Sequence, residues 1–244
     1  MTTQAPLQAH LDEAQRSVAR RSLPGMQPVG GEDWITVDDA YTAQLAEKAR
    51  LLETVPDAVL QVRAEAAIPM DELLDEVLTL LARRSDFQFS EDQVIRPDGR
   101  SINIDRKYPL KTLSQLVQED FCILQKIGEE HWLTAALLCF PASWTLAEKI
   151  GKPLTVIHTP VDSYDENIAK RVQRLFDAVR VGHPMWRANL LTYKDPALFQ
   201  PRLEADPRND DHIAHFERSE RQTILRLPKT KAVVFAIHTT VTPL

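Results

Sequence analysis

The sequence has few glycines, few cysteines and no long apolar run. Its seven glycines form neither the G-x-G-x-x-G turn of dinucleotide-binding folds nor the G-x-x-x-x-G-K-[ST] loop that surrounds nucleotide phosphates. Its two cysteines, Cys122 and Cys139, lie in apolar segments and show neither C-x-x-C nor C-x-x-H spacing, so no zinc or iron–sulfur site is indicated. We therefore expect no NAD, flavin or iron–sulfur site in this chain. Any redox chemistry would need electrons from another protein.

Basic charge and membrane-spanning segments are also missing. The formal net charge is −6 and the pI is near 5.7, and no run of lysine or arginine is long enough to supply a nucleic-acid-binding surface. No apolar segment approaches the roughly 20 residues that span a bilayer. Residues 1–14 lack the basic and apolar regions of a signal peptide. We expect a cytoplasmic protein that binds neither nucleic acid nor membrane.

The chain has enough apolar residues for a core, in a pattern of helices first and hairpins later. Of its 244 residues 43% are hydrophobic, which suffices for one domain or one domain with an appendage. Helical periodicity marks residues 1–22, 41–55, 69–81, 109–117, 144–150 and 168–179, and strand patterns mark 87–104, 121–127, 132–140, 185–193, 213–227 and 231–241. Residues 26–35 and 194–211 are predicted loops. This order predicts an α+β fold with an antiparallel sheet.

One histidine follows a stretch that combines several structural signals. Residues 139–162 read C-F-P-A-S-W-T-L-A-E-K-I-G-K-P-L-T-V-I-H-T-P-V-D, with His158 directly after an apolar run. Pro160 restricts Thr159 to extended geometry, which places the imidazole on a stiff support. Neutral imidazole is the commonest protein ligand of transition metals. His158 is therefore a candidate metal ligand, and a buried histidine bonded to the backbone is the structural alternative.

Charged residues alternate along the penultimate strand. One of its faces carries Phe216, Arg218, Glu220, Gln222, Ile224 and Arg226, and the other carries residues 217, 219, 221, 223, 225 and 227. The pattern fits a solvated sheet face, whose ion pairs contribute little to stability. It also fits a cavity wall, in which guanidinium groups hold carboxylates and Glu220 accepts a cationic amine or relays a proton.

Five segments, in order, resemble one known family. They are G-M-Q-P-V-G-G-E-D-W-I-T-V-D-D-A-Y (25–41), V-Q-E-D-F-C-I-L (117–124), C-F-P-A-S-W-T-L-A-E-K-I-G-K-P-L-T-V-I-H-T-P-V (139–161), W-R-A-N (186–189) and R-S-E-R-Q-T-I-L-R-L-P (218–228). The set resembles the α-subunit family of haem-dependent oxidative N-demethylases. Two residues depart from that family's pattern: Asp162 replaces a proline and Leu190 a tryptophan. The first departure alters the turn beside His158, and the second lies beside the pocket wall.

The resemblance implies a fold, a cofactor and partners. It implies a PAS-like antiparallel sheet over residues 85–244, with residues 1–84 as a helical extension packed on it. It also implies b-type haem in an internal cavity and the oxidation of a small secondary amine to a primary amine and an aldehyde. Electrons would come from a flavin and iron–sulfur reductase on other chains.

The resemblance also implies roles for particular residues. His158 would be the axial haem ligand, with His131 and His238 as rivals and Cys139 as a thiolate alternative. Arg218, Arg221 and Arg226 would contact the haem propionates, and Glu220, Lys149 and Gln222 would act in catalysis. A haem sensor or carrier without enzymatic activity, or a scaffold subunit, are the other functions that such a fold allows. Glu220 and its polar neighbours favour turnover.

Overall fold

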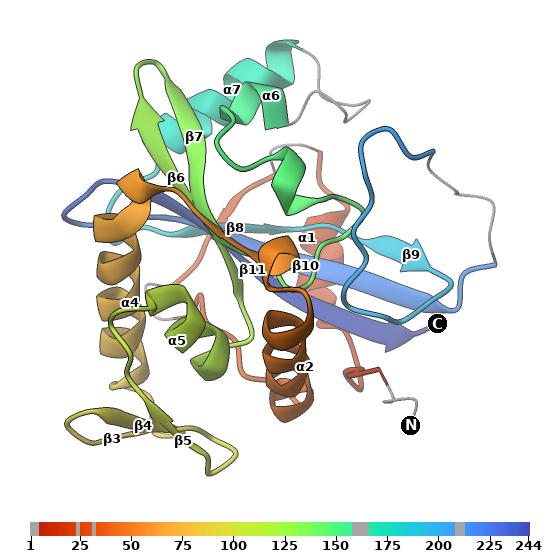
Figure 1. The fold of residues 1–244 in the computed structure, drawn as a ribbon. Helices are drawn as coiled ribbons and strands as arrows, with labels where there is room; N and C mark the ends of the chain where they lie inside the picture. The colour runs from red at the N-terminus through yellow and green to blue at the C-terminus, as the bar shows by residue number, and fades with distance from the viewer. Residues whose placement is uncertain (1–4, 23–24, 31–32, 158–165, 208–212) are drawn as a thin grey trace.

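In the computed structural model, residues 5–22, 25–30, 33–157, 166–207 and 213–244 are described. Their centre is an antiparallel sheet with the strand order β1-β8-β10-β11-β6-β7-β2, in which β9 also pairs with β10 (Figure 1). The strands are β1 (Gln27–Pro28), β2 (Leu60–Val62), β6 (Asp120–Ile127), β7 (Glu130–Leu137), β8 (Met185–Ala188), β9 (Leu191–Tyr193), β10 (Phe216–Arg226) and β11 (Val233–Pro243). A small separate sheet contains β3 (Gln88–Phe89), β4 (Gln93–Ile95) and β5 (Ser101–Asn103). The chain is therefore α+β, as its element order predicts.

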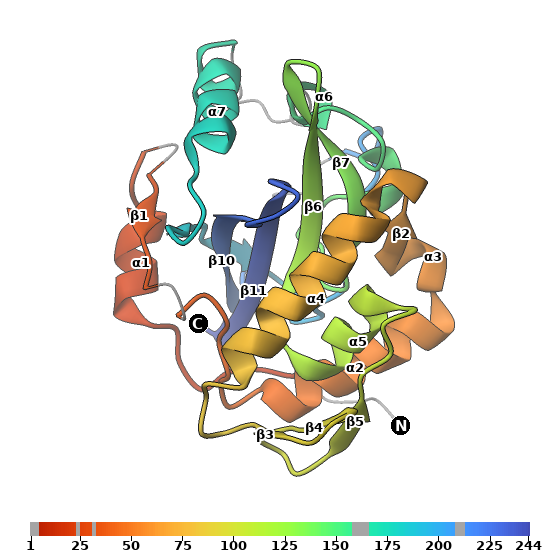
Figure 2. The same ribbon diagram turned by 90° about the vertical axis from the view of Figure 1, so that its left-hand side faces the viewer.

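Helices cover both faces of the main sheet (Figure 2). They are α1 (Glu13–Ala19), α2 (Tyr41–Thr54), α3 (Pro56–Val59), α4 (Ala67–Leu81), α5 (Pro109–Leu116), α6 (Leu154–Ile157) and α7 (Glu166–Ala178), with 3-10 turns η1 (Ala64–Ala66) and η2 (Leu146–Glu148). One hydrophobic cluster joins α2, α4 and α5 to Leu225 of β10. A second joins α6 and α7 to the neighbouring Ile224. Because side chains alternate along a strand, we call these two sides of the sheet the α2 face and the α7 face.

A glycine turn and a distant buried carboxylate stabilise the two hairpins in the middle of the sheet. Gly128 begins the two-residue turn between β6 and β7 and has φ of +61°, a conformation that glycine adopts without steric cost. Glu72 of α4 is buried, and its carboxylate accepts hydrogen bonds from the backbone N–H groups of Lys229 and Thr230 in the β10–β11 turn. The long α4 helix thereby fixes the far end of β10 and β11.

Several predicted elements are shorter than their sequence patterns indicate. Within the described part of residues 1–22, the helix covers residues 13–19, where Asp12 caps it. The predicted helix 144–150 is a single 3-10 turn, because the chain at Gly151 leaves it to donate a hydrogen bond to the Leu133 carbonyl of β7. The predicted strand 185–193 is two strands, because Asn189 turns its N–H and side chain toward Glu220. Residues 27–28, in a predicted loop, pair with β8.

Residues before position 84 contribute to the main sheet. Both β1 and β2 pair with strands of the C-terminal part, and the larger hydrophobic cluster extends from Trp34 to Val241. A domain boundary near residue 84 stays a prediction. None of the helices in the described ranges has both the length and the apolarity needed to cross a membrane.

Candidate functional site

Two of the motifs quoted above meet at adjacent strands. The segment W-R-A-N forms β8 and its end, and the segment R-S-E-R-Q lies in β10, with Arg187 opposite Gln222. Glu220 is 4% exposed, and its Oε2 atom accepts hydrogen bonds from Asn189 Nδ2 at 2.8 Å and Gln222 Nε2 at 2.9 Å. The backbone N–H of Glu220 donates to Asn189 Oδ1 at 2.8 Å. One carboxylate oxygen is therefore held rigidly by two amides.

The second carboxylate oxygen of Glu220, Oε1, has fewer contacts than Oε2. Its closest described cation is Arg218, whose Nη2 lies 4.0 Å from Oε1. That guanidinium is fully buried, and it donates to the backbone carbonyls of Phe140 at 2.7 Å and Leu198 at 3.0 Å. Arg218 therefore anchors two loops to β10 and sets a positive charge beside Glu220. Oε1 makes no hydrogen bond with the described residues.

Arg187 is a second cation next to Glu220. Its side chain is half-buried on the strand beside β10. Burial lowers the pKa of its guanidinium, and the negative charge of Glu220 acts in the opposite direction. Within the described residues its hydrogen bonding is limited to a 3.4 Å contact from Nη2 to the Ala188 carbonyl. A poorly paired, desolvated guanidinium is a natural partner for an anion.

Apolar side chains form the rest of the α7 face around this cluster. Glu220 and Gln222 share it with Ile224, because they alternate with the residues of the α2 face. The buried apolar residues on this side are Cys122, Leu124, Leu133, Ala136, Leu138, Leu146, Leu154, Phe176, Val179, Ile224, Val233 and Ile237. The arrangement is an extended apolar wall with charged and amide groups at one end.

The structure does not bring Arg221 and Arg226 to this cluster. Arg221 lies on the α2 face, where it donates to Thr36 Oγ1 and to the backbone carbonyl of Asp33. Arg226 lies at the far end of β10, where its guanidinium donates to the carbonyls of Phe176 and Val179 at the C-terminal end of α7. Arg226 thereby satisfies carbonyls that the helix leaves without partners.

Lys149 stabilises the backbone close to the predicted ligand. Its ammonium is almost fully buried and donates to the carbonyl of Ile157 at 2.6 Å and to the carboxylate of Glu204. This ion pair lowers the pKa of Glu204. The backbone N–H of Glu204 is in turn bonded to Glu148. Lys149 therefore connects the end of α6 with the loop before β10, instead of facing Glu220.

His158 lies outside the described residues, directly after Ile157. Its rival His131 is buried on β7 under α7, with Nδ1 3.0 Å from Gln173 Nε2 and its ring against Phe176. Burial lowers the pKa of His131, and its Nε2 has no partner among the described residues. Cys139 belongs to the α2-face cluster, and burial raises the pKa of its thiol, which disfavours a thiolate.

His238, the other rival, lies in a buried ion-pair network on the α2 face. Its Nε2 is 2.9 Å from Asp38 Oδ2, and its Nδ1 is 3.3 Å from Glu119 Oε1. Burial alone would lower the pKa of His238, but the hydrogen bonds and charges of these carboxylates raise it to about 9. The pKa of Asp38 falls to about 2, because its bonds to His238, Gln118 and Gln8 outweigh desolvation. A protonated imidazole between two carboxylates has no free lone pair for a metal.

The raised pKa of His238 predicts a pH-dependent stability. Its contribution is fully present below pH 6.5, the ordinary pKa, and is lost as the pH rises through about 9. The shift corresponds to about 3 kcal/mol of unfolding free energy. We expect His238→Gln to lower stability by this order at pH 6 and by much less at pH 9.5. Urea unfolding of both proteins at each pH measures it.

The difference in unfolding free energy between wild type and His238→Gln reports on His238 alone, because the other titrating groups are the same in both proteins. Burial raises the pKa values of the Cys122 and Cys139 thiols, so both proteins lose stability together at high pH. A stability difference that stays constant from pH 6 to pH 9.5 would contradict a charged His238.

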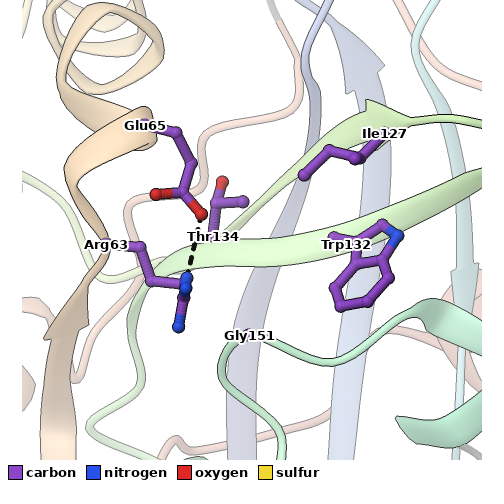
Figure 3. Close-up of a pocket in the computed structure, with 6 residues that line it drawn as sticks. All are labelled: Arg63, Glu65, Ile127, Trp132, Thr134 and Gly151. Atoms are coloured by element: carbon purple, nitrogen blue, oxygen red, sulfur yellow. Dashed lines mark hydrogen bonds and ion pairs between the residues drawn. The ribbon is translucent and has the colours of Figure 1, made fainter.

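Two of the hollows that the described residues form are open to solvent. The larger, about 700 Å³, lies on the α2 face, and its lining includes Arg221, Trp186 and His238. The smaller, about 150 Å³, lies at the other edge of the sheet, where Trp132 of β7 faces the Arg63–Glu65 ion pair (Figure 3). Neither contains Glu220. No group of three or more histidine, cysteine or acidic side chains in the described ranges is arranged to hold a metal ion.

Sequence reasoning missed Arg187 and Asn189 as site residues. Both stand in the segment W-R-A-N, which was recognised as a motif without a role. Their role depends on the pairing of β8 with β10, which brings residues more than 30 positions apart into contact. The available signal is a pair of polar residues next to a tryptophan, one in a short strand and one directly after it.

Comparison with protein families gives a match over most of the chain. The family model described as "Haem-dependent oxidative N-demethylase, alpha subunit-like" matches residues 25–244. The match includes all the segments that surround Glu220 and the stretch that leads to His158. The description names an oxidative, haem-dependent activity and one subunit of a multi-component enzyme. The chain therefore belongs to the haem-dependent oxidative N-demethylase, alpha subunit-like family.

Proposed function

We propose that this chain is a haem-dependent monooxygenase that removes a methyl group from a small secondary amine, with electrons from a separate flavin and iron–sulfur reductase. The observation that carries the proposal is the buried Glu220 carboxylate, held by Asn189 and Gln222 beside an apolar wall in a member of this family. A carboxylate in this setting binds a small ammonium ion and excludes bulk water.

A b-type haem would lie against the α7 face. The apolar wall suits a macrocycle, and the poorly paired guanidinium of Arg187 would hold a propionate. Oε1 of Glu220, with no hydrogen bond among the described residues, remains for a substrate. We propose His158 as the axial ligand and a PAS-like sheet as the scaffold. The bound haem would supply oxygen activation and insertion of one oxygen atom into a methyl C–H bond.

His131 is a weaker candidate for the ligand because of its place in the sheet. It pairs with Lys126 near the β6–β7 turn, two residues beyond Leu124, which is level with Arg226 of β10 through β11. Six residues of strand separate Arg226 from Glu220, about 20 Å at a rise of about 3.3 Å per residue. Phe176 and Gln173 also cover the ring of His131, so α7 would have to move before a cofactor could reach it.

Glu220 would hold the substrate and accept its proton. A protonated secondary amine donates an N–H to Oε1, and the two amides keep the carboxylate from rotating. Proton transfer to Glu220 leaves a neutral amine, whose methyl carbon is then hydroxylated. The resulting carbinolamine breaks its C–N bond and yields a primary amine and formaldehyde. One oxygen molecule, two electrons and two protons complete the balance, with water as the other product.

Lys149 would position the ligand segment by its bond to the Ile157 carbonyl. We expect Lys149→Met to speed haem dissociation by about tenfold, because a charge-assisted bond next to His158 is lost. Transfer of haem to a scavenger protein gives the rate. Lys152→Met is the matched control, because Lys152 is nearby and bonds the Leu133 N–H through its backbone carbonyl. Equal dissociation rates for wild type and Lys149→Met would contradict this role.

The need for a reductase gives a direct test of the function. We expect NADH alone to leave the haem of the purified chain oxidised, and an added ferredoxin with its reductase to reduce it. Dimethylamine should then stimulate oxygen uptake and release formaldehyde. Haem reduction with neither amine-dependent uptake nor formaldehyde would favour a sensor or carrier. Reduction of the haem by NADH without a second protein would contradict the need for a separate reductase.

A further inference from the structure

A cleft of about 700 Å³ on the α2 face is lined by charged residues that have no role in the proposed demethylation. It lies on the opposite side of the sheet from Glu220, because Arg221 and Glu220 are consecutive residues of β10. Residues 8–15 form one wall, and these precede the family match at residue 25. The rest is formed by residues from 28–30 and 33–39, by Trp186, and by the centre of β10 and β11. Its size is within the range of small-molecule sites.

Two cations line this cleft, and Arg221 is the one whose charge is not already paired, because His238 lies between Asp38 and Glu119. Its guanidinium lies 5.1 Å from the centre of the Trp186 ring and bonds Thr36 Oγ1 at 3.1 Å and the Asp33 carbonyl at 2.8 Å. These contacts use two of its five N–H groups. Within the described residues no carboxylate lies within 4.0 Å of it. Burial lowers the pKa of Arg221, so the folded protein holds this charge at a cost.

Three exposed aspartates line the same cleft, each with a carboxylate oxygen to which no described residue donates. Asp12 uses Oδ1 to cap α1, and Asp39 uses Oδ2 to accept the N–H of Ala9. Asp33 is exposed and contributes its backbone carbonyl to Arg221. Asp38 is different, because its carboxylate is already paired with His238. The cleft therefore presents one fixed, stacked guanidinium and three carboxylates with spare acceptors.

We propose that this cleft binds a small zwitterion, with its carboxylate on Arg221 and its ammonium group on the aspartates. A simple anion at Arg221 would also meet negative charge, because Glu119, Asp33 and Asp12 all act electrostatically on that guanidinium. A simple cation would meet the aspartates but also Arg221. A ligand that carries both charges satisfies both groups, and Trp186 holds the guanidinium plane in place for a two-point contact. This site does not depend on the proposed haem chemistry.

Matched fragments test the two-charge requirement. The ¹H–¹⁵N spectrum of the labelled protein would be titrated with glycine, β-alanine and 4-aminobutanoate, and with acetate and methylammonium. The indole N–H of Trp186, assigned with Trp186→Phe, reports on the cleft. We expect at least one zwitterion to bind about tenfold more tightly than either fragment. Acetate or methylammonium binding as tightly as the best zwitterion, or no saturable shift with any of them, overturns the proposal.

Charge-neutral variants locate the binding groups without removing local bonds. Asn still caps α1 at position 12 and still accepts the Ala9 N–H at position 39, so Asp12→Asn and Asp39→Asn change the charge alone. We expect each to weaken zwitterion binding severalfold, and Arg221→Met to abolish it. Asp195→Asn is the control, because Asp195 accepts the Ala197 N–H in a similar turn away from the cleft. Unchanged affinity in both aspartate variants would overturn the assignment of the ammonium group.

Discussion

Glu220→Gln is expected to retain haem and to lose most amine oxidation, by about 10²- to 10⁴-fold. The glutamine carbonyl can still accept the hydrogen bonds of Asn189 and Gln222, so the shape of the site is kept. What disappears is the negative charge that holds a protonated amine and receives its proton. Haem content, formaldehyde release and amine-dependent oxygen uptake, measured on one preparation, separate the two effects.

Glu217→Gln is the matched control for this substitution. Glu217 lies on the same strand, on the other face, and pairs with Arg16 of α1. The same chemical change there also removes a buried carboxylate, and it should leave turnover unaltered. Wild-type turnover in Glu220→Gln, or equal losses in the two variants, would mean that the charge of Glu220 has no catalytic role.

Removal of His158 is expected to have the largest effect on the haem. His158→Ala should lower haem occupancy and change the ferric and ferrous absorption spectra, because the proposed axial ligand is lost. Added imidazole should restore a histidine-like spectrum if the rest of the pocket is intact. His183→Ala, at an exposed histidine in a turn, should behave as wild type. An unchanged spectrum in His158→Ala would direct attention to His131.

The local features of this fold could be predicted from the sequence. The β6–β7 and β4–β5 hairpins follow from short turns with Gly128 and Gly99 at positive φ. The stripe of leucines in α4 and the proline at the start of α5 set those two helices. The alternation along β10 also placed Glu220 and Gln222 on one face. All of these depend on residues close together in the chain.

The site itself depends on contacts that no local pattern contains. Arg187 comes next to Glu220 through the register of β8 on β10, and a shift by one residue would turn it to the other face. Arg226 and Lys149 could be recognised as charged residues near important segments. Arg226 bonds the end of α7 and Lys149 bonds the end of α6, because those helices pack against the sheet beside these residues. The position of a charged residue in the sequence does not indicate to which backbone carbonyl its side chain will donate.

Haem titration into the haem-free protein tests the central claim most directly. Absorption spectroscopy of wild type and Arg187→Met would be followed as haem is added. We predict saturation at one haem per chain for wild type, and a weaker, still specific complex for Arg187→Met, because an apolar wall remains without the cation that faces it. The absence of a saturable complex in wild type, or binding with no defined stoichiometry, would contradict the account.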